Sequence, residues 1–455
     1  MEQVKNMSLR ERLGGFGDAK NITGTENVLS KSSYSELKKH IHTTVLERIN
    51  LERLRNHTQE QIIKEINDLV SVIIEEQNIA LNQFERKNLT QDIQHEMFGL
   101  GPLEPLLNDP TISDILINGY KQVYIERKGK LELTNVQFQN NDHLLNIIER
   151  IVSRVGRRID ESSPMVDARL ADGSRVNAII PPLALDGPVV SIRRFSVNPL
   201  MVNDLLRLGS ITKEMATLIS AVSKAKINTI ISGGTGSGKT TLLNLISGFI
   251  PEYERIVTIE DAAELQMRQP HIVRLETRPP NIEERGEVTQ RALVRNALRM
   301  RPDRIILGEV RGPEALDMLQ AMNTGHEGSF ATIHANTPRD AIARMENMVS
   351  MAGANLAMSA VRQQIASAIN VIIQVSRLTD GTRKVVSIQE ITGMEGETIT
   401  MQEIFGFKQT GVNEDGKIKG YYYATGLVPH FNRRLKAFGV ELPENMFNPA
   451  VRYEV

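Results

Sequence analysis

The stretch I-N-T-I-I-S-G-G-T-G-S-G-K-T-T-L-L, residues 227–243, joins a short apolar run to a predicted helix through a glycine-rich turn. Within it, Gly233, Gly238, Lys239 and Thr240 fit the pattern G-x-x-x-x-G-K-[ST], which is typical of a loop that cradles phosphates. An ordinary glycine-rich turn is the alternative. It is disfavoured because the flanking strand and helix signals are where a phosphate site needs them. The stretch therefore predicts a nucleoside triphosphate site.

The residue types in this loop have a chemical reason. Backbone N–H groups converge on phosphate oxygens where the chain reaches positive φ and no Cβ intervenes, which glycine allows. The positive end of the following helix points at the same anion. We expect Lys239 to bridge the β- and γ-phosphates and the Thr240 hydroxyl to ligate Mg²⁺. The predicted cofactors are ATP and Mg²⁺, and the predicted nucleotide-binding residues are Gly233, Gly234, Thr235, Gly236, Ser237, Gly238, Lys239, Thr240 and Thr241.

The composition limits what kind of protein this is. At 455 residues the chain is long enough for two or three domains, each with its own core. Its 54 Lys and Arg against 55 Asp and Glu, with 4% aromatic residues, disfavour a nucleic-acid channel, which needs basic and aromatic side chains. The absence of cysteine suits a reducing cytoplasm. The charged start does not look like a signal peptide, and no run of about 18 apolar residues predicts a membrane span.

Hydrophobic periodicity and turn residues divide the chain. Apolar residues at spacings of three and four over 34–98 predict helices, with Thr58 and Gln61 as a capping box. We expect an α/β fold: a C-terminal RecA-like P-loop domain with a parallel-rich sheet, preceded by an α+β domain and an N-terminal helical segment. The expected segments are a flexible tail (1–32), a helical bundle (33–98), an α/β domain (99–195), a linker (196–212), the P-loop domain (213–400) and a C-terminal extension (401–455).

Strands alternate with helices after Thr212, which is expected to cap the first of these helices. Such alternation predicts a parallel sheet covered on both faces, with the nucleotide at the carboxyl ends of the strands. The strand candidates are 227–231, 255–260, 304–308 and 329–333, and a hairpin over 370–390 turns at Asp380–Gly381.

Two stretches after the loop place acids at strand ends. Glu260, Asp261 and Glu264 lie within five residues, a spacing that suits polarising a water and holding Mg²⁺ through its water shell. Capping of a helix N-terminus by Glu260 or Asp261 remains the alternative. In the second stretch, 304–311, Gly308 stands where a Walker B strand usually has Asp, so only Glu309 supplies a carboxylate. We expect Glu309 to act on Mg²⁺ through water or on the attacking water.

Two histidines flank the last strand candidate. His326 and His334 lie eight residues apart, but no ligand set of suitable spacing joins them, so a metal site is disfavoured. We expect His326 to sense the γ-phosphate and His334 to contact a neighbouring subunit. Satisfied structural histidines are the alternative.

Arginines form two groups. Arg291, Arg295 and Arg299 fall at spacings of four and predict a basic helix face, either solvated or paired across subunits. Arg175, Arg193 and Arg194 belong to the domain before the linker. Since an arginine at the γ-phosphate supplies charge that a P-loop alone lacks, these three are candidate catalytic residues.

With these stretches in this order, the chain resembles the secretion-superfamily ATPases of type II and type IV secretion and type IV pili, whose motifs are called Walker A, Asp box, atypical Walker B and His box. Upstream, G-L-G-P-L-E-P-L-L and V-D-A-R-L-A-D-G-S-R-V-N-A-I-I-P-P-L-A-L-D-G-P, together with S-I-R-R-F, look like the CpaF-type branch, the motor of Tad pili. The spacing of the two histidines differs by one residue from that of retraction ATPases, so the chain does not look like that branch.

The resemblance implies roles by position. Lys239 and Thr240 match the phosphate and Mg²⁺ residues, Glu264 the glutamate that activates water, Glu309 the Walker B glutamate and His326 the His-box residue. Arg175, Arg193 and Arg194 match arginines that approach the γ-phosphate. It further implies a homo-oligomer, a hexameric ring, cytoplasmic and peripheral to the inner membrane, working against polytopic platform proteins and without nucleic acid.

The expected function is thus a ring-forming ATPase that powers assembly, and possible retraction, of a Tad or type IV-like pilus. A type IV secretion or archaeal-type filament motor is the alternative, and a nucleic-acid-dependent RecA-like ATPase is a further one. A small-molecule kinase is disfavoured because such an enzyme needs fewer than 455 residues. A GTPase is disfavoured because no N-K-x-D motif occurs.

Overall fold

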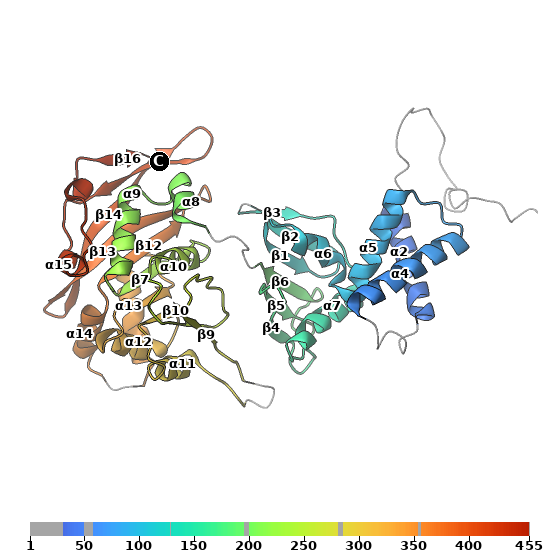
Figure 1. Cartoon of the computed structure of the whole chain (residues 1–455), viewed down its shortest axis with the longest axis horizontal. Helices are drawn as coiled ribbons and strands as arrows, with labels where there is room; N and C mark the ends of the chain where they lie inside the picture. The colour runs from blue at the N-terminus through green and yellow to red at the C-terminus, as the bar shows by residue number, and fades with distance from the viewer. Residues whose placement is uncertain are drawn as a thin grey trace, which may run out of the picture. The chain divides into compact units, whose positions relative to one another are not determined.

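The computed structural model describes residues 31–49, 58–127, 129–194, 200–280, 285–353 and 356–454. The chain divides into two compact units, Met1–Phe195 and Ser196–Val455 (Figure 1). Of the expected tail 1–32, all but the last two residues lie outside the described residues.

Among the described residues, three helices form the first part of unit 1. The capping box that the sequence predicts before α4 is present, because the Thr58 hydroxyl accepts from the Gln61 N–H and the Gln61 side chain accepts from the Thr58 N–H. Apolar residues three and four positions apart on each helix meet in one core that includes Ile41, Ile73 and Leu89. The helices are α2 (Lys31–Arg48), α4 (Gln59–Glu76) and α5 (Gln83–Phe98).

An antiparallel sheet of six strands, in the order β3-β2-β1-β6-β5-β4, completes unit 1. Alternate residues such as Ile115, Val176 and Ile192 are buried against Ile147 and Ile151 of α7, so the residues between them lie on the opposite face. The elements are η1 (Gly101–Leu103), α6 (Glu104–Asn108), β1 (Ile112–Asn118), β2 (Gln122–Arg127), β3 (Lys130–Leu133), α7 (Asn141–Arg154), β4 (Met165–Arg169), β5 (Arg175–Ile179) and β6 (Val189–Arg193).

Unit 2 begins with a regular alternation of helices and strands. Thr212 caps α9 as expected, its side chain accepting from the Met215 N–H. The elements are α8 (Val202–Arg207), α9 (Lys213–Lys224), β7 (Thr229–Gly233), α10 (Lys239–Ser247), β8 (Ile256–Glu260), β9 (Ile272–Glu276), α11 (Gln290–Ala297), β10 (Arg304–Val310), α12 (Glu314–Asn323), β11 (Phe330–Ile333), α13 (Pro338–Ser350), α14 (Met358–Ala368) and β12 (Val371–Arg377).

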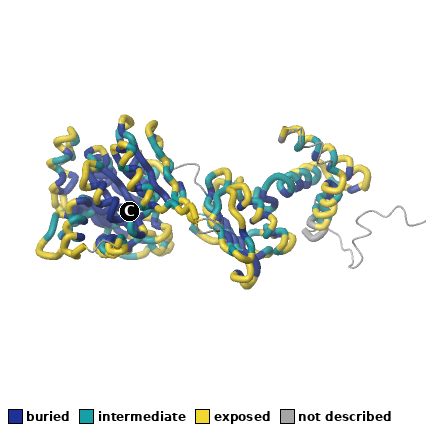
Figure 2. Tube along the Cα trace, turned by 90° about the horizontal axis from the view of Figure 1, so that it is seen from below, coloured by how far each residue is buried: buried dark blue, intermediate teal, exposed yellow. Residues whose placement is uncertain are grey.

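A single ten-stranded sheet organises this unit, in the order β16-β15-β14-β13-β12-β7-β11-β10-β8-β9. The strands from β12 to β9 in this order are parallel, which confirms the predicted α/β fold with a parallel-rich sheet. Ile231 packs with α9 and α10 on one face, and Ile230 packs with α12, α13 and α14 on the other. The strands are accordingly buried on both faces, as the dark blue tube in Figure 2 shows.

The predicted hairpin over 370–390 is present, since β12 and β13 pair in antiparallel fashion. The sequence did not indicate β9, nor did it place the last part of the chain, where three further strands extend the sheet. The expected boundary between 400 and 401 falls inside β14, so the C-terminal extension continues the same sheet. The remaining elements are β13 (Arg383–Glu395), β14 (Thr398–Val412), β15 (Ile418–Ala424), α15 (Asn432–Ala437), η2 (Glu444–Phe447) and β16 (Arg452–Glu454).

Intrachain ion pairs account for much of the arginine pattern. Arg291 and Arg295 of α11 both donate to Asp317 of α12, at 2.8 and 2.7 Å. The sequence predicts a basic helix face that is either solvated or paired across subunits. The two ion pairs instead lie within one chain. Arg304, the first residue of β10, is fully buried and forms a bidentate ion pair with Glu254.

Among the described residues, no helix is both long enough and apolar enough to cross a bilayer.

Candidate functional site

The glycine-rich loop connects β7 to α10, at the carboxyl edge of the parallel strands. Gly236 and Gly238 have φ values of 68° and 100°, a region that side chains rarely occupy. Gly233 needs to be glycine for another reason: a Cβ there would collide with the carbonyl oxygen of Val375 and with Ser237 Oγ. The loop therefore has the geometry that the phosphate-binding prediction requires.

Lys239 opens α10 and folds back over the loop. Its Nζ donates to the carbonyl oxygens of Gly233 and Gly234, both at 3.0 Å. Burial lowers the pKa of Lys239, against the opposing influence of Glu309, and Arg311 adds to the lowering. The ammonium group is thus held beside the loop, near a carboxylate from another strand. Thr240 and Thr241 follow in the first turn of α10, both half-buried.

Glu309 reaches this site from the end of β10. Burial alone would raise its pKa, but the hydrogen bond and charge of Arg311 and the charge of Lys239 hold the pKa below its ordinary value. Arg311 Nη2 lies 2.8 Å from Glu309 Oε2. Glu309 is consequently ionised at neutral pH, which suits a carboxylate that orients a water or a hydrated cation.

Arg311 also joins the acids that follow β8. Its Nη1 lies 3.5 Å from Asp261 Oδ2, and Glu264 is close enough to raise its pKa further, although the Glu309 hydrogen bond is the main cause. Glu309, Asp261 and Glu264 therefore surround one guanidinium. No pattern in the sequence singles out Arg311 for this position.

Glu260 ends β8 and is 3% exposed. Its Oε1 accepts from the backbone N–H groups of Glu264 and Leu265, at 2.8 and 2.9 Å, while its buried Oε2 has no hydrogen-bond partner. Burial raises the pKa of Glu260 to about 7, despite these two hydrogen bonds. The alternative of helix capping is wrong in one respect, because residues 261–271 form no helix. Glu260 instead fixes the loop that carries Glu264.

Gly308 faces Glu260 across the two paired strands. A Cβ on Gly308 would lie 2.8 Å from Glu260 Cγ, well inside a normal carbon–carbon contact. The glycine at the position where a Walker B strand usually has Asp is thus explained by packing, since the Glu260 side chain occupies the space.

The two histidines lie at opposite ends of β11, so only one of them is at the edge of the sheet that carries the glycine-rich loop. His326 precedes the strand, so it is at the amino edge, where its carbonyl accepts from the Ser329 hydroxyl. His334 follows the strand at the carboxyl edge. Burial lowers the pKa of His334, and the nearby charge of Lys239 lowers it further. His334, and not His326, therefore belongs to the candidate site.

Of the three candidate arginines in unit 1, two lie together. Arg175 and Arg193 are opposite each other on β5 and β6, on the face away from α7, and Arg169 of β4 is opposite Arg175. Arg194 points elsewhere: its guanidinium donates to the backbone carbonyls of Asp109 and Ile112. These contacts anchor Arg194 within its own domain, and the expected contact with a γ-phosphate stays a prediction for Arg175 and Arg193.

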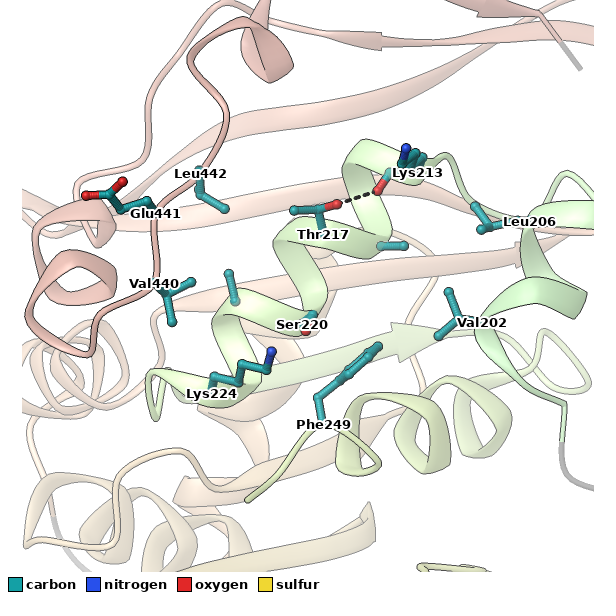
Figure 3. A pocket seen from close by; sticks show the side chains of 12 residues that line it. Val202, Leu206, Lys213, Thr217, Ser220, Lys224, Phe249, Val440, Glu441 and Leu442 are labelled. Atoms are coloured by element: carbon teal, nitrogen blue, oxygen red, sulfur yellow. Dashed lines mark hydrogen bonds between the residues drawn. The ribbon is translucent and has the colours of Figure 1, made fainter. Parts of the chain in front are cut away.

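A groove elsewhere in unit 2 is separate from this site. Figure 3 shows Thr217, Ser220 and Lys224 of α9 between α8 on one side and residues 440–442 on the other. No residue of the phosphate loop lines it.

Comparison with known proteins identifies the family of the chain. The model of the family described as type II/IV secretion system protein matches residues 96–422. The chain belongs to this family.

Three relatives illustrate the relationship. A putative conjugal transfer protein of Mycobacterium tuberculosis (strain H37Rv) is 39% identical to this secretion-family protein over 310 residues, 67% of this chain and 88% of the relative. The type IV secretion system protein VirB11 of Bartonella quintana is 29% identical over 345 residues, 68% of this chain and 96% of its own. The crystal structure of the VirB11 ATPase from the Brucella suis type IV secretion system, in complex with sulphate, is 28% identical, covers 66% of this chain and 96% of its own, and has a TM-score of 0.34.

The residues of this secretion-family protein fit Mg²⁺ bound together with a nucleotide. Within the described ranges, no group of three or more His, Asp or Glu side chains could hold a metal ion by itself. A P-loop needs no such group, because the threonine hydroxyl and the nucleotide's own phosphates supply ligands. Thr240 in the first turn of α10, with Glu309 and Asp261 nearby for contact through water, provides this kind of donor set.

Proposed function

We propose that this protein is an ATP hydrolase that works as the motor of a secretion or pilus system. The observation that carries the proposal is the gathering of Lys239, Glu309 and His334 at the loop between β7 and α10, where Lys239 and Glu309 influence each other's ionisation and both influence that of His334. A lysine, an ionised carboxylate and an imidazole beside a phosphate-binding loop form a site suited to hydrolysis of a terminal phosphate.

The residues at this loop have separate roles in the proposed hydrolysis. The loop N–H groups and Lys239 bind the phosphates, and Mg²⁺, held through Thr240, would neutralise charge on the phosphate oxygens. Glu264 and Glu309 orient the attacking water, with Glu260 holding the backbone of Glu264 in place. Burial and the charge of Lys239 lower the pKa of His334, which favours the neutral imidazole, and a neutral imidazole can donate a hydrogen bond to the γ-phosphate without adding charge.

Arg175 and Arg193 are proposed to complete the site in a ring of several copies, a hexamer by resemblance. A γ-phosphate contact from these arginines would supply the transition-state charge that Lys239 alone does not. The names of the relatives favour conjugal transfer or type IV secretion as the machine that the motor serves. A Tad pilus motor is a second candidate, supported by the sequence blocks of residues 99–107 and 191–195. In either case we propose a cytoplasmic location at the inner membrane, against membrane-embedded partners.

The test compares two variants by nucleotide binding and by ATPase rate. Lys239→Ala should fold but lose binding of ATP. Glu309→Gln should bind ATP normally and hydrolyse it about 100-fold more slowly. Rates measured against protein concentration, together with mass by light scattering, should show activity rising as rings assemble. Turnover retained in Lys239→Ala would refute the site, and a fully active monomer would refute the ring.

A further inference from the structure

The hairpin between β12 and β13 lies next to the phosphate loop. β12 pairs in parallel with β7 up to the contact of Val375 with Gly233, so both strands end at the same edge. The chain then turns at Asp380–Gly381 and returns as β13. Because β11 and β10 lie on the other side of β7, the hairpin and Glu309 flank the loop from opposite sides.

Two arginines of this hairpin reach the loop glycines. Arg383 Nε donates to the carbonyl oxygen of Gly236 at 2.9 Å, although the two residues are 147 positions apart. Arg383 Cδ would be 3.5 Å from a Cβ on Gly238, and Arg377 Nη1 would be 3.6 Å from a Cβ on Gly236. Both side chains therefore border the segment whose N–H groups are expected to hold phosphate.

The positive charge of Arg383 has no counter-charge within the described residues. No carboxylate of that part of the chain forms an ion pair with it, and its guanidinium makes one hydrogen bond, through Nε. The two Nη groups of this exposed side chain are free to donate to a ligand. Arg311, on the other side of the loop, is paired with Glu309. An unneutralised positive charge beside an anion-binding loop matches the negative charge of a polyphosphate.

The turn that presents Arg383 is held on several sides. Asp380 accepts from the Thr382 N–H and hydroxyl and from the Ile418 N–H of β15. On the opposite side of β13, the buried Lys384 donates to the carbonyl oxygen of Gly209 at 3.0 Å. A braced turn presents the guanidinium with little loss of conformational freedom on binding, which strengthens a contact.

We infer that Arg383 binds the nucleotide's phosphates on the side of the loop away from Glu309. These are the phosphates that ADP and ATP share. The inference rests on the proposed function, because it requires a nucleotide at the loop. It gives the β12–β13 hairpin a role in binding, separate from the γ-phosphate chemistry at β10 and β11.

The test separates charge from the hydrogen bond to Gly236. Arg383→Gln keeps amide donors but loses the charge, whereas Arg383→Lys keeps the charge and loses Nε. Arg433→Gln, which removes an exposed arginine of α15, is the matched control. Binding of ADP and of a non-hydrolysable ATP analogue is measured by calorimetry on the full chain, with circular dichroism to verify folding.

Arg383→Gln should weaken both ligands about tenfold or more, while Arg383→Lys stays within about threefold of the parent and Arg433→Gln is unchanged. Three results would overturn the inference. In the first, Arg383→Gln binds ADP as tightly as the parent does, and in the second, Arg383→Lys and Arg383→Gln lose affinity equally. The third is a loss of affinity in Arg383→Gln for the ATP analogue alone. If the parent itself bound no nucleotide, or Lys239→Ala bound it equally well, the proposed function would fail instead.

Discussion

Adding one methyl group to Gly308 should destabilise the protein, and the position of Glu260 is the reason. A Cβ at Gly308 would lie 2.8 Å from Glu260 Cγ and 3.4 Å from both its Cβ and its Oε1. Carbon atoms pack best at about 3.5–4.0 Å, so the two side chains overlap by roughly 1 Å. Glu260 cannot simply turn away, since its Oε1 holds two backbone N–H groups.

Overpacking of this kind typically costs about 1–3 kcal/mol. The backbone of Gly308 itself is unstrained, because its φ lies outside the left-handed region, and alanine would otherwise be better than glycine in a strand by about 0.5–1 kcal/mol. We therefore expect Gly308→Ala to lower the free energy of unfolding by about 1–2 kcal/mol in the parent. In a Glu260→Ala background the clashing Cγ is gone, and the same change should be neutral or stabilising.

The assay is a double-mutant cycle by guanidinium unfolding, followed by circular dichroism, on the parent, the two single variants and the double variant. Glu260→Ala alone also destabilises, because the N–H groups of Glu264 and Leu265 lose their acceptor. The coupling energy isolates the contact and should be about 1–3 kcal/mol. An equal effect of Gly308→Ala in both backgrounds would refute the packing explanation of the missing Walker B aspartate.

Two further predictions concern ionisable groups. His334→Ala should slow ATP hydrolysis about tenfold or more, whereas His326→Ala should leave the rate within about twofold, because only His334 lies at the carboxyl edge; the reverse order in a steady-state assay would restore the expectation from sequence. Burial alone would raise the pKa of Glu96, but His143 and Lys38 lower it to about 2, so its stabilising contribution is present above pH 4.5 and is lost as pH falls toward 2. Glu96→Gln should therefore be less stable by about 3 kcal/mol at neutral pH, with the difference shrinking in acid unfolding followed by circular dichroism; a gap independent of pH would contradict the ion-pair explanation.

The sequence predicted the parts of the site that local rules govern. The loop from Gly233 to Thr240 combines residue types with few other uses, and the apolar run before Glu309 marks a buried strand whose end lies at the nucleotide edge. The capping of helices by Thr58 and Thr212 follows from hydrogen bonds between residues three positions apart. Each of these predictions depends on short-range geometry.

Other features needed the folded chain. His326 and His334 flank one strand, and because the two ends of a parallel strand lie at opposite edges of a sheet, only one of the two histidines lies beside the loop. Arg194 directly follows Arg193 in the chain. Because successive side chains of an extended chain point in opposite directions, the two arginines point away from each other. For β14 and β15, aromatic and turn residues were visible, but their pairing with β13 joins segments whose register only the folded chain determines.

By itself the sequence determined the glycine-rich loop, the parallel strands around it and the acids at their ends, because each depends on residues close together in the chain. Only the tertiary structure decided that the charge of Lys239 acts on His334, that Glu260 takes the space opposite Gly308, and that Arg383 contacts Gly236. These interactions join segments far apart in sequence. Their distances depend on strand order and register, which many buried residues of both faces settle together.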